Sequence, residues 1–204
     1  MICHDLKCIF IHIPRCAGTS VEIWLAGRDW WQIDPASKHL TARQARTAYA
    51  GYWDDYFKFA IVRHPVSRSR SCLKYGAHFG LAQTPDGGID FTGYHARFGD
   101  RIVVERDHRF HPPEAVEYHR HRQRQIYGNI LDDDLDFVAR FETLAQDMGR
   151  VRRQLGLKRA FDFHTEKSAR HSRQSALPAK TLGKVHALYA RDFAAFDYSR
   201  DPVS

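Results

Sequence analysis

The sequence predicts an α/β fold in which a central parallel sheet is flanked by helices. Two strand, loop and helix units within the first 75 residues carry this prediction, because parallel strands need crossover connections, usually helices. The first unit is an apolar run over residues 6–13, followed after a loop by a helix over 20–26. The second is the aromatic and β-branched run 56–62, which ends at Arg63, and a helical pattern over about 66–75.

Two short elements and one long loop are predicted around these units. A strand is expected over 30–33, and a helix over 41–50 whose first residue, Thr41, is a favoured N-cap. Residues 76–100 are rich in Gly, Thr, Asp and Pro without a sustained period, which predicts a long loop or lid.

The last third of the chain adds a strand and two helices to the prediction. Residues 135–141 are predicted as a strand, and Thr143 and Gln146 have the spacing of a capping box at the start of the next helix. Gly156 ends that helix. Its apolar face consists of Leu144, Met148, Val151 and Leu155. A last amphipathic helix is expected over 178–191.

Length and composition limit the class of protein. With 204 residues, 43% of them hydrophobic and 27% charged, the chain is expected to form one globular domain over 1–204. No apolar run approaches the ~18 residues of a membrane span, and the cysteines show no zinc or disulfide spacing, so a cytoplasmic protein with reduced thiols is expected. The net charge of +7 and the 13 histidines favour anionic ligands.

The loop over residues 14–20, between the first strand and the first helix, predicts an anion site. Ala17 and Gly18 allow backbone amides to approach a ligand closely, and a helix N-terminus adds N–H groups and a positive dipole end. Thr19 and Glu22 have the spacing of a capping box. A nucleoside triphosphatase loop would have Lys and then Ser or Thr after its last glycine, whereas Gly18 is followed by Thr19. Phosphate is therefore expected, and a magnesium-dependent P-loop kinase is not.

The second unit carries a further candidate anion site, formed by Arg63, Ser67, Arg68 and Ser71. Arg63 lies at the carboxyl end of its strand, where open α/β sheets bind ligands, and Ser71 lies about two helical turns further on. A guanidinium and a hydroxyl in these places can share one phosphate. The alternative, a solvated basic start of a helix, stays open on spacing alone.

Both loops together resemble the donor site of sulfotransferases. Residues 11–20, Ile-His-Ile-Pro-Arg-Cys-Ala-Gly-Thr-Ser, resemble their 5′-phosphosulfate loop, and residues 59–71 resemble their 3′-phosphate segment. The likeness is greatest to the branch with the heparan 2-O and chondroitin sulfotransferases. Residues 137–144 are similar to a strand and helix of that branch, and 188–193 with 196–199 to its C-terminal signature.

The resemblance implies a P-loop-like sulfotransferase fold and the donor 3′-phosphoadenosine 5′-phosphosulfate (PAPS), which leaves as adenosine 3′,5′-bisphosphate, with no metal. It implies that Arg63 and Ser71 hold the 3′-phosphate. It also implies that the 5′ side is held by Arg15, Cys16, Ala17, Gly18, Thr19 and Ser20.

One of these residues, Arg15, departs from the pattern of many relatives. They have a lysine at this place, which stabilises the bridging oxygen as sulfate leaves. Tyrosylprotein sulfotransferases and some bacterial glycolipid sulfotransferases are similar to this chain in having Pro-Arg. Arg15 is therefore compatible with a catalytic role, although arginine cannot donate a proton at neutral pH.

Transfer to a hydroxyl also needs a base that removes its proton. His39 is the candidate, because it precedes a predicted helix where related enzymes carry a histidine, and because a neutral imidazole has a suitable pKa. Asp34 and Glu22 are alternative bases. The alternative that His39 is only a surface histidine beside a helix cap also stays open.

The acceptor side has no readable motif. Residues 107–124 are dense in His and Arg, which indicates either a basic wall over an acidic acceptor or a solvated face. Gln125 corresponds to a glutamine that contacts the acceptor in related enzymes. His119 and His121 lack a carboxylate or thiol that would complete a zinc pattern, so no metal site is predicted.

Together these observations predict a PAPS-dependent transferase that sulfates a hydroxyl of a carbohydrate, with neither nucleic acid nor membrane as a partner. Two alternatives remain. One is a basic protein that binds nucleic acid or another polyanion. The other is a sulfotransferase-like protein that binds the nucleotide without turnover.

Overall fold

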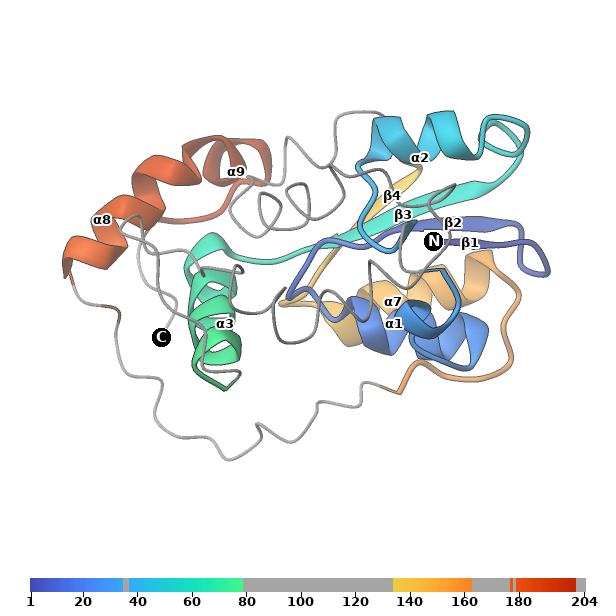
Figure 1. The fold of residues 1–204 in the computed structure, drawn as a ribbon, viewed down its shortest axis with the longest axis horizontal. Helices are drawn as coiled ribbons and strands as arrows, with labels where there is room; N and C mark the ends of the chain where they lie inside the picture. Colours follow the sequence, from blue (N-terminus) through green and yellow to red (C-terminus); the bar gives the residue numbers. More distant parts are fainter. Residues whose placement is uncertain (35–36, 79–133, 163–176, 178, 201–204) are drawn as a thin grey trace.

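The computed structural model describes residues 1–34, 37–78, 134–162, 177 and 179–200. Its centre is one sheet in the order β1 (Ile2–Cys3), β2 (Cys8–Ile11), β3 (Phe57–Val62) and β4 (Phe137–Arg140). β1 runs antiparallel to β2, and β2, β3 and β4 are parallel (Figure 1). The expected α/β fold with a central parallel sheet is therefore confirmed.

Burial explains why the two longer strands are continuous apolar runs. All four residues of β2 and the last four of β3 are buried, because both faces of these strands are covered. The register pairs Ile11 with Ala60, and Val62 with Arg140. The carboxyl ends of β2, β3 and β4 consequently meet at one edge of the sheet.

Helices cover the sheet on both faces. α1 (Gly18–Ala26) and α7 (Leu144–Gln154) lie on one face, and α2 (Ala42–Ala48) lies on the other (Figure 1). Met148 and Val151 of α7 are fully buried in the main core. The apolar face predicted for this helix is thus the face that it turns toward the sheet.

Three further helices lie beyond the carboxyl ends of the strands (Figure 1). α3 (Pro65–His78) packs against α8 (Ala179–Leu188), which in turn contacts α9 (Ala190–Ala195). They share a second, smaller core that consists of Val66, Val185, Tyr189 and Phe193. The C-terminal helices therefore stabilise the start of α3.

Two predicted elements differ from the structure. The segment expected as a strand over 30–33 is a 3₁₀ helix, Trp30–Gln32, in which the amide of Ile33 donates to the carbonyl of Trp30 at 3.0 Å. The carboxylate of Glu22 accepts the Trp30 amide at 3.1 Å and so fixes this turn. The helix expected over 178–191 is broken at Tyr189 into α8 and α9.

Of three predicted helix caps, the structure confirms one. The hydroxyl of Thr41 accepts the amide of Gln44 at 3.2 Å, and the Gln44 side chain accepts the amide of Thr41 at 3.0 Å. The box predicted at Thr19 and Glu22 is wrong, because α1 already begins at Gly18 and Glu22 is buried.

The capping box predicted at Thr143 and Gln146 is also wrong, although Thr143 is the N-cap residue. Its hydroxyl donates to the Asp147 carboxylate at 2.8 Å, and that carboxylate also accepts the amide of Arg140 at 2.9 Å. The stop at Gly156 is confirmed, since Gly156 adopts a left-handed φ of 63° immediately after Leu155, the C-cap of α7.

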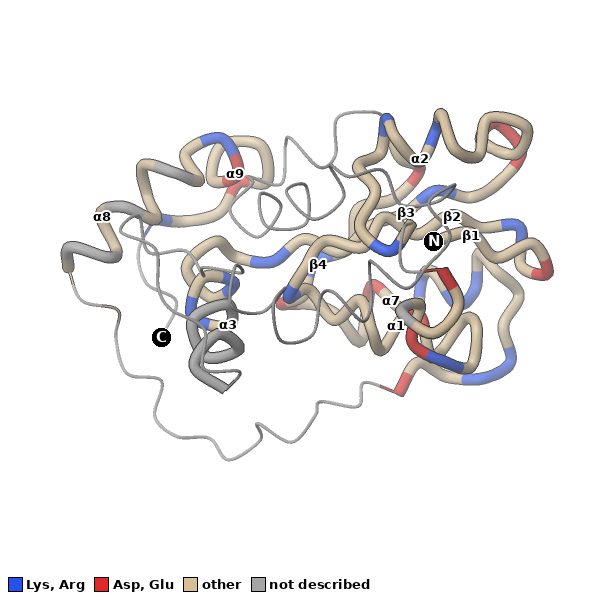
Figure 2. The backbone as a smooth tube through the Cα atoms, in the orientation of Figure 1, with Lys and Arg blue, Asp and Glu red and all other residues tan. Residues whose placement is uncertain are grey.

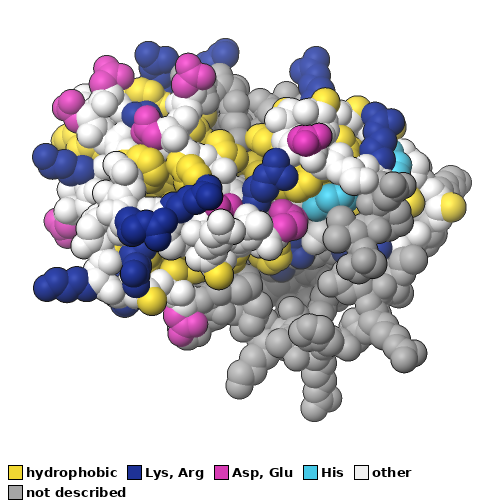
Figure 3. All heavy atoms as spheres, turned by 180° about the vertical axis from the view of Figure 1, so that it is seen from behind, with side chains coloured by type: hydrophobic (Ala, Val, Ile, Leu, Met, Phe, Trp, Pro, Cys, Tyr) yellow, Lys and Arg dark blue, Asp and Glu magenta, His cyan; other side chains and the backbone are white. Residues whose placement is uncertain are grey.

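Several expectations fall on residues that the structure does not describe. They are residues 79–100 of the predicted loop or lid, the His- and Arg-rich segment 107–124, and Gln125. The first three residues predicted for that loop, 76–78, are helical instead, because α3 continues to His78. In the described part of the chain, no helix has the length and apolar character needed to cross a membrane. Lys and Arg residues are spread along the described backbone with Asp and Glu residues among them (Figures 2 and 3).

Candidate functional site

The loop over residues 14–20, called the first loop below, has an unusual backbone. Arg15 and Ala17 both have left-handed φ angles, of 67° and 63°. For residues other than glycine this conformation costs roughly 1–3 kcal/mol each, and it is concentrated at binding and catalytic sites. Alternating backbone conformations of this kind turn successive amides into a concave anion seat, here at the N-terminus of α1.

Gly18 allows this loop to close over the imidazole of His12. A Cβ atom at Gly18 would lie only 2.1 Å from both Cδ2 and Nε2 of the His12 ring. The glycine that the sequence suggested for ligand approach is thus also required by the packing beneath the loop.

The segment over residues 63–71, called the second segment below, is bonded directly to the first loop. Nη1 of Arg63 donates to the carbonyl of Arg15 at 3.2 Å, and Nε of Arg15 donates to the hydroxyl of Ser71 at 3.2 Å. Arg63 also donates through Nε to Ser67 at 2.8 Å, and its guanidinium lies 4.0 Å from the ring centre of Phe141. Three predicted site residues, Arg15, Arg63 and Ser71, are thereby brought together.

Arg68 is a second connection between the two loops. Its side chain is completely buried, Nε donates to the carbonyl of Pro14 at 2.9 Å, and Nη1 donates to the hydroxyl of Tyr189 at 3.2 Å. Sequence reasoning grouped Arg68 with possible phosphate ligands. These contacts tie the first loop to the C-terminal helices.

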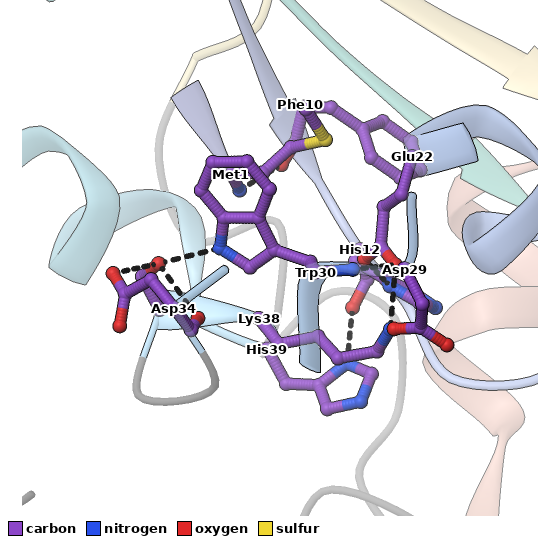
Figure 4. Close-up of polar contacts among 10 residues, drawn as sticks. Met1, Phe10, His12, Glu22, Asp29, Trp30, Asp34, Lys38 and His39 are labelled. Carbon is purple, nitrogen blue, oxygen red and sulfur yellow. Dashed lines mark hydrogen bonds and ion pairs between the residues drawn. The ribbon is translucent and has the colours of Figure 1, made fainter. Parts of the chain in front are cut away.

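Behind the first loop, Glu22 connects the end of β2 to the segment that carries His39 (Figure 4). Oε1 of Glu22 accepts from Nδ1 of His12 at 2.5 Å. Oε2 accepts from Nζ of Lys38 at 2.5 Å, and Lys38 also contacts Asp29 at 2.5 Å. The three central side chains, Glu22, Lys38 and His12, are 0%, 2% and 5% exposed, so water screens these charges little.

This arrangement fixes the charge states of the buried groups. Burial alone would raise the pKa of Glu22, but His12 and Lys38 outweigh burial and lower that pKa to about 2. Burial lowers the pKa of His12 despite the neighbouring carboxylate. Glu22 is therefore ionised at neutral pH, and a neutral His12 donates its Nδ1–H to it.

His39 lies against the same end of β2. Its ring centre is 4.4 Å from that of His12, and its Nδ1 lies 3.0 Å from the backbone carbonyl of His12. Because a carbonyl oxygen only accepts, Nδ1 of His39 carries a hydrogen, and in the neutral ring Nε2 is the acceptor nitrogen. His39 is 9% exposed, so it is not the plain surface histidine that the sequence left open.

The C-terminal signature lies at the same edge of the sheet. The amide of His64 donates to Glu142 at 2.8 Å, and the hydroxyl of Tyr198 donates to that carboxylate at 3.1 Å. Nδ1 of His64 accepts the amide of Val66 at 3.2 Å, so Nε2 donates to the carbonyl of Ser199 at 2.9 Å. The chain after α9 is thus attached to the start of the second segment.

These features place two linked loops, both candidates for anion binding, and a positioned histidine at the carboxyl edge of a parallel sheet. A model of the sulfotransferase family matches residues 1–199. The chain belongs to that family. No curated protein and no solved structure matches it. As a sulfotransferase, the protein transfers sulfuryl groups, and the match spans the first loop, the second segment and the C-terminal signature.

The other predicted site residues of this sulfotransferase have different environments. Cys16 is 1% exposed and its thiol donates to the Pro14 carbonyl at 3.7 Å, whereas Thr19 is exposed and Ser20 half-buried. Sequence reasoning missed His12 and Lys38. A histidine in an otherwise apolar strand end and a lysine beside His39 were the available signals, but their partner, Glu22, is distant in sequence.

A polar hollow of about 570 Å³ lies at the opposite edge of the sheet, near the first residues of β3 and β4. Its lining includes Lys7, Asp54 and Asp136. Open α/β sheets bind ligands at the carboxyl ends of their strands, so the two loops are the candidate site and this hollow is not. Among the described residues, no three His, Cys, Asp or Glu side chains converge as metal ligands.

Proposed function

We propose that this sulfotransferase takes its sulfuryl group from PAPS, transfers it to a hydroxyl of a carbohydrate, and releases adenosine 3′,5′-bisphosphate. The observation that carries the donor assignment is the bond from Arg63 to the carbonyl of Arg15. It joins two anion loops side by side, which suits a nucleotide with phosphate groups at both its 3′ and 5′ ends.

The described residues fit this donor. Arg63 and Ser71 would hold the 3′-phosphate. The backbone amides at the start of α1 would hold the 5′ side, with the side chains of Thr19 and Ser20. An arginine has five N–H donors in a planar fork, so Arg63 can brace the first loop and bind an anion at the same time.

Arg15 would stabilise the charge that develops on the oxygen between phosphorus and sulfur as that bond breaks. A guanidinium keeps its charge throughout, so Arg15 acts by electrostatics and hydrogen bonding without giving up a proton. Its left-handed backbone and its bond to Ser71 fix where its side chain begins and which way it runs. Such preorganisation lowers the barrier because little reorientation accompanies the reaction.

His39 is the base in this proposal. Its Nδ1–H is held by the carbonyl of His12, so Nε2 is the nitrogen that takes the proton of the acceptor hydroxyl. Glu22 is less suited, because both of its oxygens are engaged by buried donors. Asp34 accepts the hydroxyl of Ser37 at 2.5 Å, which gives it a structural partner. Glu22 therefore serves as a positioning residue, and Asp34 as a cap of its own turn.

The carbohydrate acceptor is supported by the resemblance to carbohydrate sulfotransferases and by the formal net charge of +7, which favours anionic polymers. Gln125 and the segment 107–124 are the residues proposed to contact it. They lie outside the described residues, so the acceptor assignment rests on sequence.

The donor assignment is tested by thermal unfolding with adenosine 3′,5′-bisphosphate or with ATP and magnesium. A ligand that binds the native state raises the melting temperature by mass action. We expect a rise with the bisphosphate for the wild type and for Arg153→Ala, an exposed arginine of α7, and at least about tenfold weaker binding for Arg63→Ala. Absence of any rise in the wild type at saturating bisphosphate would overturn the donor assignment.

The acceptor and the base are tested by transfer of labelled sulfate from PAPS to a set of polysaccharides, glycolipids and phenols. We expect label on carbohydrate hydroxyls, and a loss of about 10²–10⁴-fold in rate for His39→Asn with bisphosphate binding retained. Transfer to phenols alone would contradict the carbohydrate assignment. An unchanged rate for His39→Asn would contradict its role as base.

A further inference from the structure

Cys3 and Cys8 face each other across the hairpin formed by β1 and β2. The register pairs Cys3 with Cys8 and Ile2 with Ile9. Directly opposed residues of an antiparallel pair carry their side chains on the same face, with Cβ atoms about 4.5–5.5 Å apart. The two sulfur atoms therefore meet on one side of a hairpin whose turn contains residues 4–7.

The backbone between the two cysteines has a spacing that a disulfide can span. Two residues along the ladder, the amide of Phe10 donates to the carbonyl of Met1 at 2.9 Å, and the nitrogen of Met1 donates to the carbonyl of Phe10 at 2.7 Å. Hydrogen-bonded pairs recur at every second position, so Cys3 and Cys8 form such a pair, with Cα atoms about 5.5 Å apart. Disulfides commonly have Cα separations of about 4.4–6.8 Å, which this pair meets, and Cβ separations of about 3.5–4.5 Å, so the two Cβ atoms approach each other by roughly 1 Å when the bond closes.

The two thiols differ in access and acidity. Cys3 is half-buried and Cys8 is 1% exposed. A hydrogen bond from the Cys8 thiol lowers the pKa of Cys3 to about 6. Burial opposes this lowering in part, and a hydrogen bond from the backbone amide of Leu6 adds to it. The same bond and burial raise the pKa of Cys8. An accessible thiolate beside a buried thiol is the arrangement of an attacking and a resolving cysteine.

We propose that Cys3 and Cys8 are an oxidisable dithiol site that peroxides convert to a disulfide. The Cys3 thiolate attacks one peroxide oxygen, the O–O bond breaks, and the departing hydroxide takes a proton and leaves as water. Cys3 is then a sulfenic acid. The sulfur of Cys8 attacks it, the S–O bond breaks, and a second water leaves with the proton of Cys8. Two thiols and one hydrogen peroxide thus give one disulfide and two waters.

This site is separate from the loops that bind the donor in our proposed function. Cys16, which lies in the first loop, is buried and its thiol donates to the carbonyl of Pro14. Cys16 therefore serves as a control within the same chain, because its thiol is buried but is not opposed by a second cysteine across the hairpin. Oxidation at Cys3 and Cys8 is therefore expected to precede any change at Cys16.

The sequence makes the product easy to recognise. Trypsin cuts after Lys7 and after Arg15, which separates residues 1–7, with Cys3, from residues 8–15, with Cys8. The full chain is treated with hydrogen peroxide under native conditions, alkylated, digested without a reducing agent and analysed by mass spectrometry. We expect these two peptides as one linked species, which dithiothreitol separates again.

Two variants and a parallel measurement complete the test. Cys8→Ser should lose the linked species and accumulate sulfenic acid at Cys3, whereas Cys3→Ser should lose it and leave Cys8 open to alkylation after unfolding. Separately alkylated Cys3 and Cys8 peptides from wild type after peroxide treatment, or a linkage of Cys3 to Cys16, would overturn the proposal. The rise in melting temperature with adenosine 3′,5′-bisphosphate, measured on the same samples, reports the donor site independently.

Discussion

The imidazole of His12 fills the space in which a Cβ atom on Gly18 would lie, 2.1 Å from both Cδ2 and Nε2 of the ring. The same imidazole donates a hydrogen bond to Glu22, and the backbone carbonyl of His12 accepts one from Nδ1 of His39. The first loop, the buried ion pair and the proposed base are therefore connected through one residue at the end of β2. Changes at any of them should affect the others.

Gly18→Ala is expected to destabilise the fold by about 1–3 kcal/mol, because the new methyl group must displace a buried ring. Bisphosphate binding should weaken too, since the ring lies beneath the first loop. Gly51→Ala is the matched control, because its Cβ would meet no atom within 4 Å. Urea unfolding of both variants and bisphosphate titrations test this, and equal stability of the two variants would contradict it.

Glu22→Gln should cost about 3–5 kcal/mol of unfolding free energy, because it removes one charge of a buried ion pair. Asp54→Asn, at an exposed position, should change it by no more than about 0.5 kcal/mol. Urea denaturation measures both. Adding Lys38→Met to Glu22→Gln should restore part of the loss, since the buried ammonium that Glu22 no longer neutralises is then gone. A double variant less stable than Glu22→Gln argues against the assignment.

Acid should destabilise the protein in a window set first by His12. Burial lowers the pKa of His12 below 6.5, so at pH values just below 6.5 the unfolded state binds more protons than the folded state. The contribution of His12 to the unfolding free energy is therefore fully present above pH 6.5 and declines as the pH falls below that value. Glu22, lowered from 4.5 to about 2, adds a second decline that begins near pH 4.5. His12→Gln should flatten the curve between pH 6.5 and 4.5 and also reduce the second decline, because His12 is the neighbour that lowers the pKa of Glu22 most. Chemical denaturation at several pH values shows whether the two curves differ.

Tyr189→Phe should cost about 1 kcal/mol and loosen the first loop, because it removes the hydroxyl that accepts from Arg68. Tyr52→Phe is the control, since the side chain of Tyr52 is 46% exposed. Thermal unfolding compares their stability, and hydrogen exchange of residues 14–20 reports the loop. Equal exchange rates in both variants would show that the bond from Arg68 to Tyr189 does not hold this loop.

The sequence by itself determined those features whose cause is local. Apolar runs identified β2 and β3, Thr41 identified a cap, and Gly156 identified the end of α7, because each depends on residues a few positions apart. The two candidate anion loops and the α/β fold were likewise predictable, since strand, loop and helix follow one another directly along the chain. β1 was missed, because two residues are too few to show a period.

Only the tertiary structure decided how these pieces act together. Glu22 has the spacing of a helix cap in the sequence, yet in the fold it accepts from His12 and Lys38, because a buried carboxylate is stabilised most by buried donors. Arg63 meets the carbonyl of Arg15, 48 residues earlier in the chain, because parallel pairing of β2 and β3 brings both loops to one edge. Partners at such separations are set by sheet register and packing, which no local pattern records.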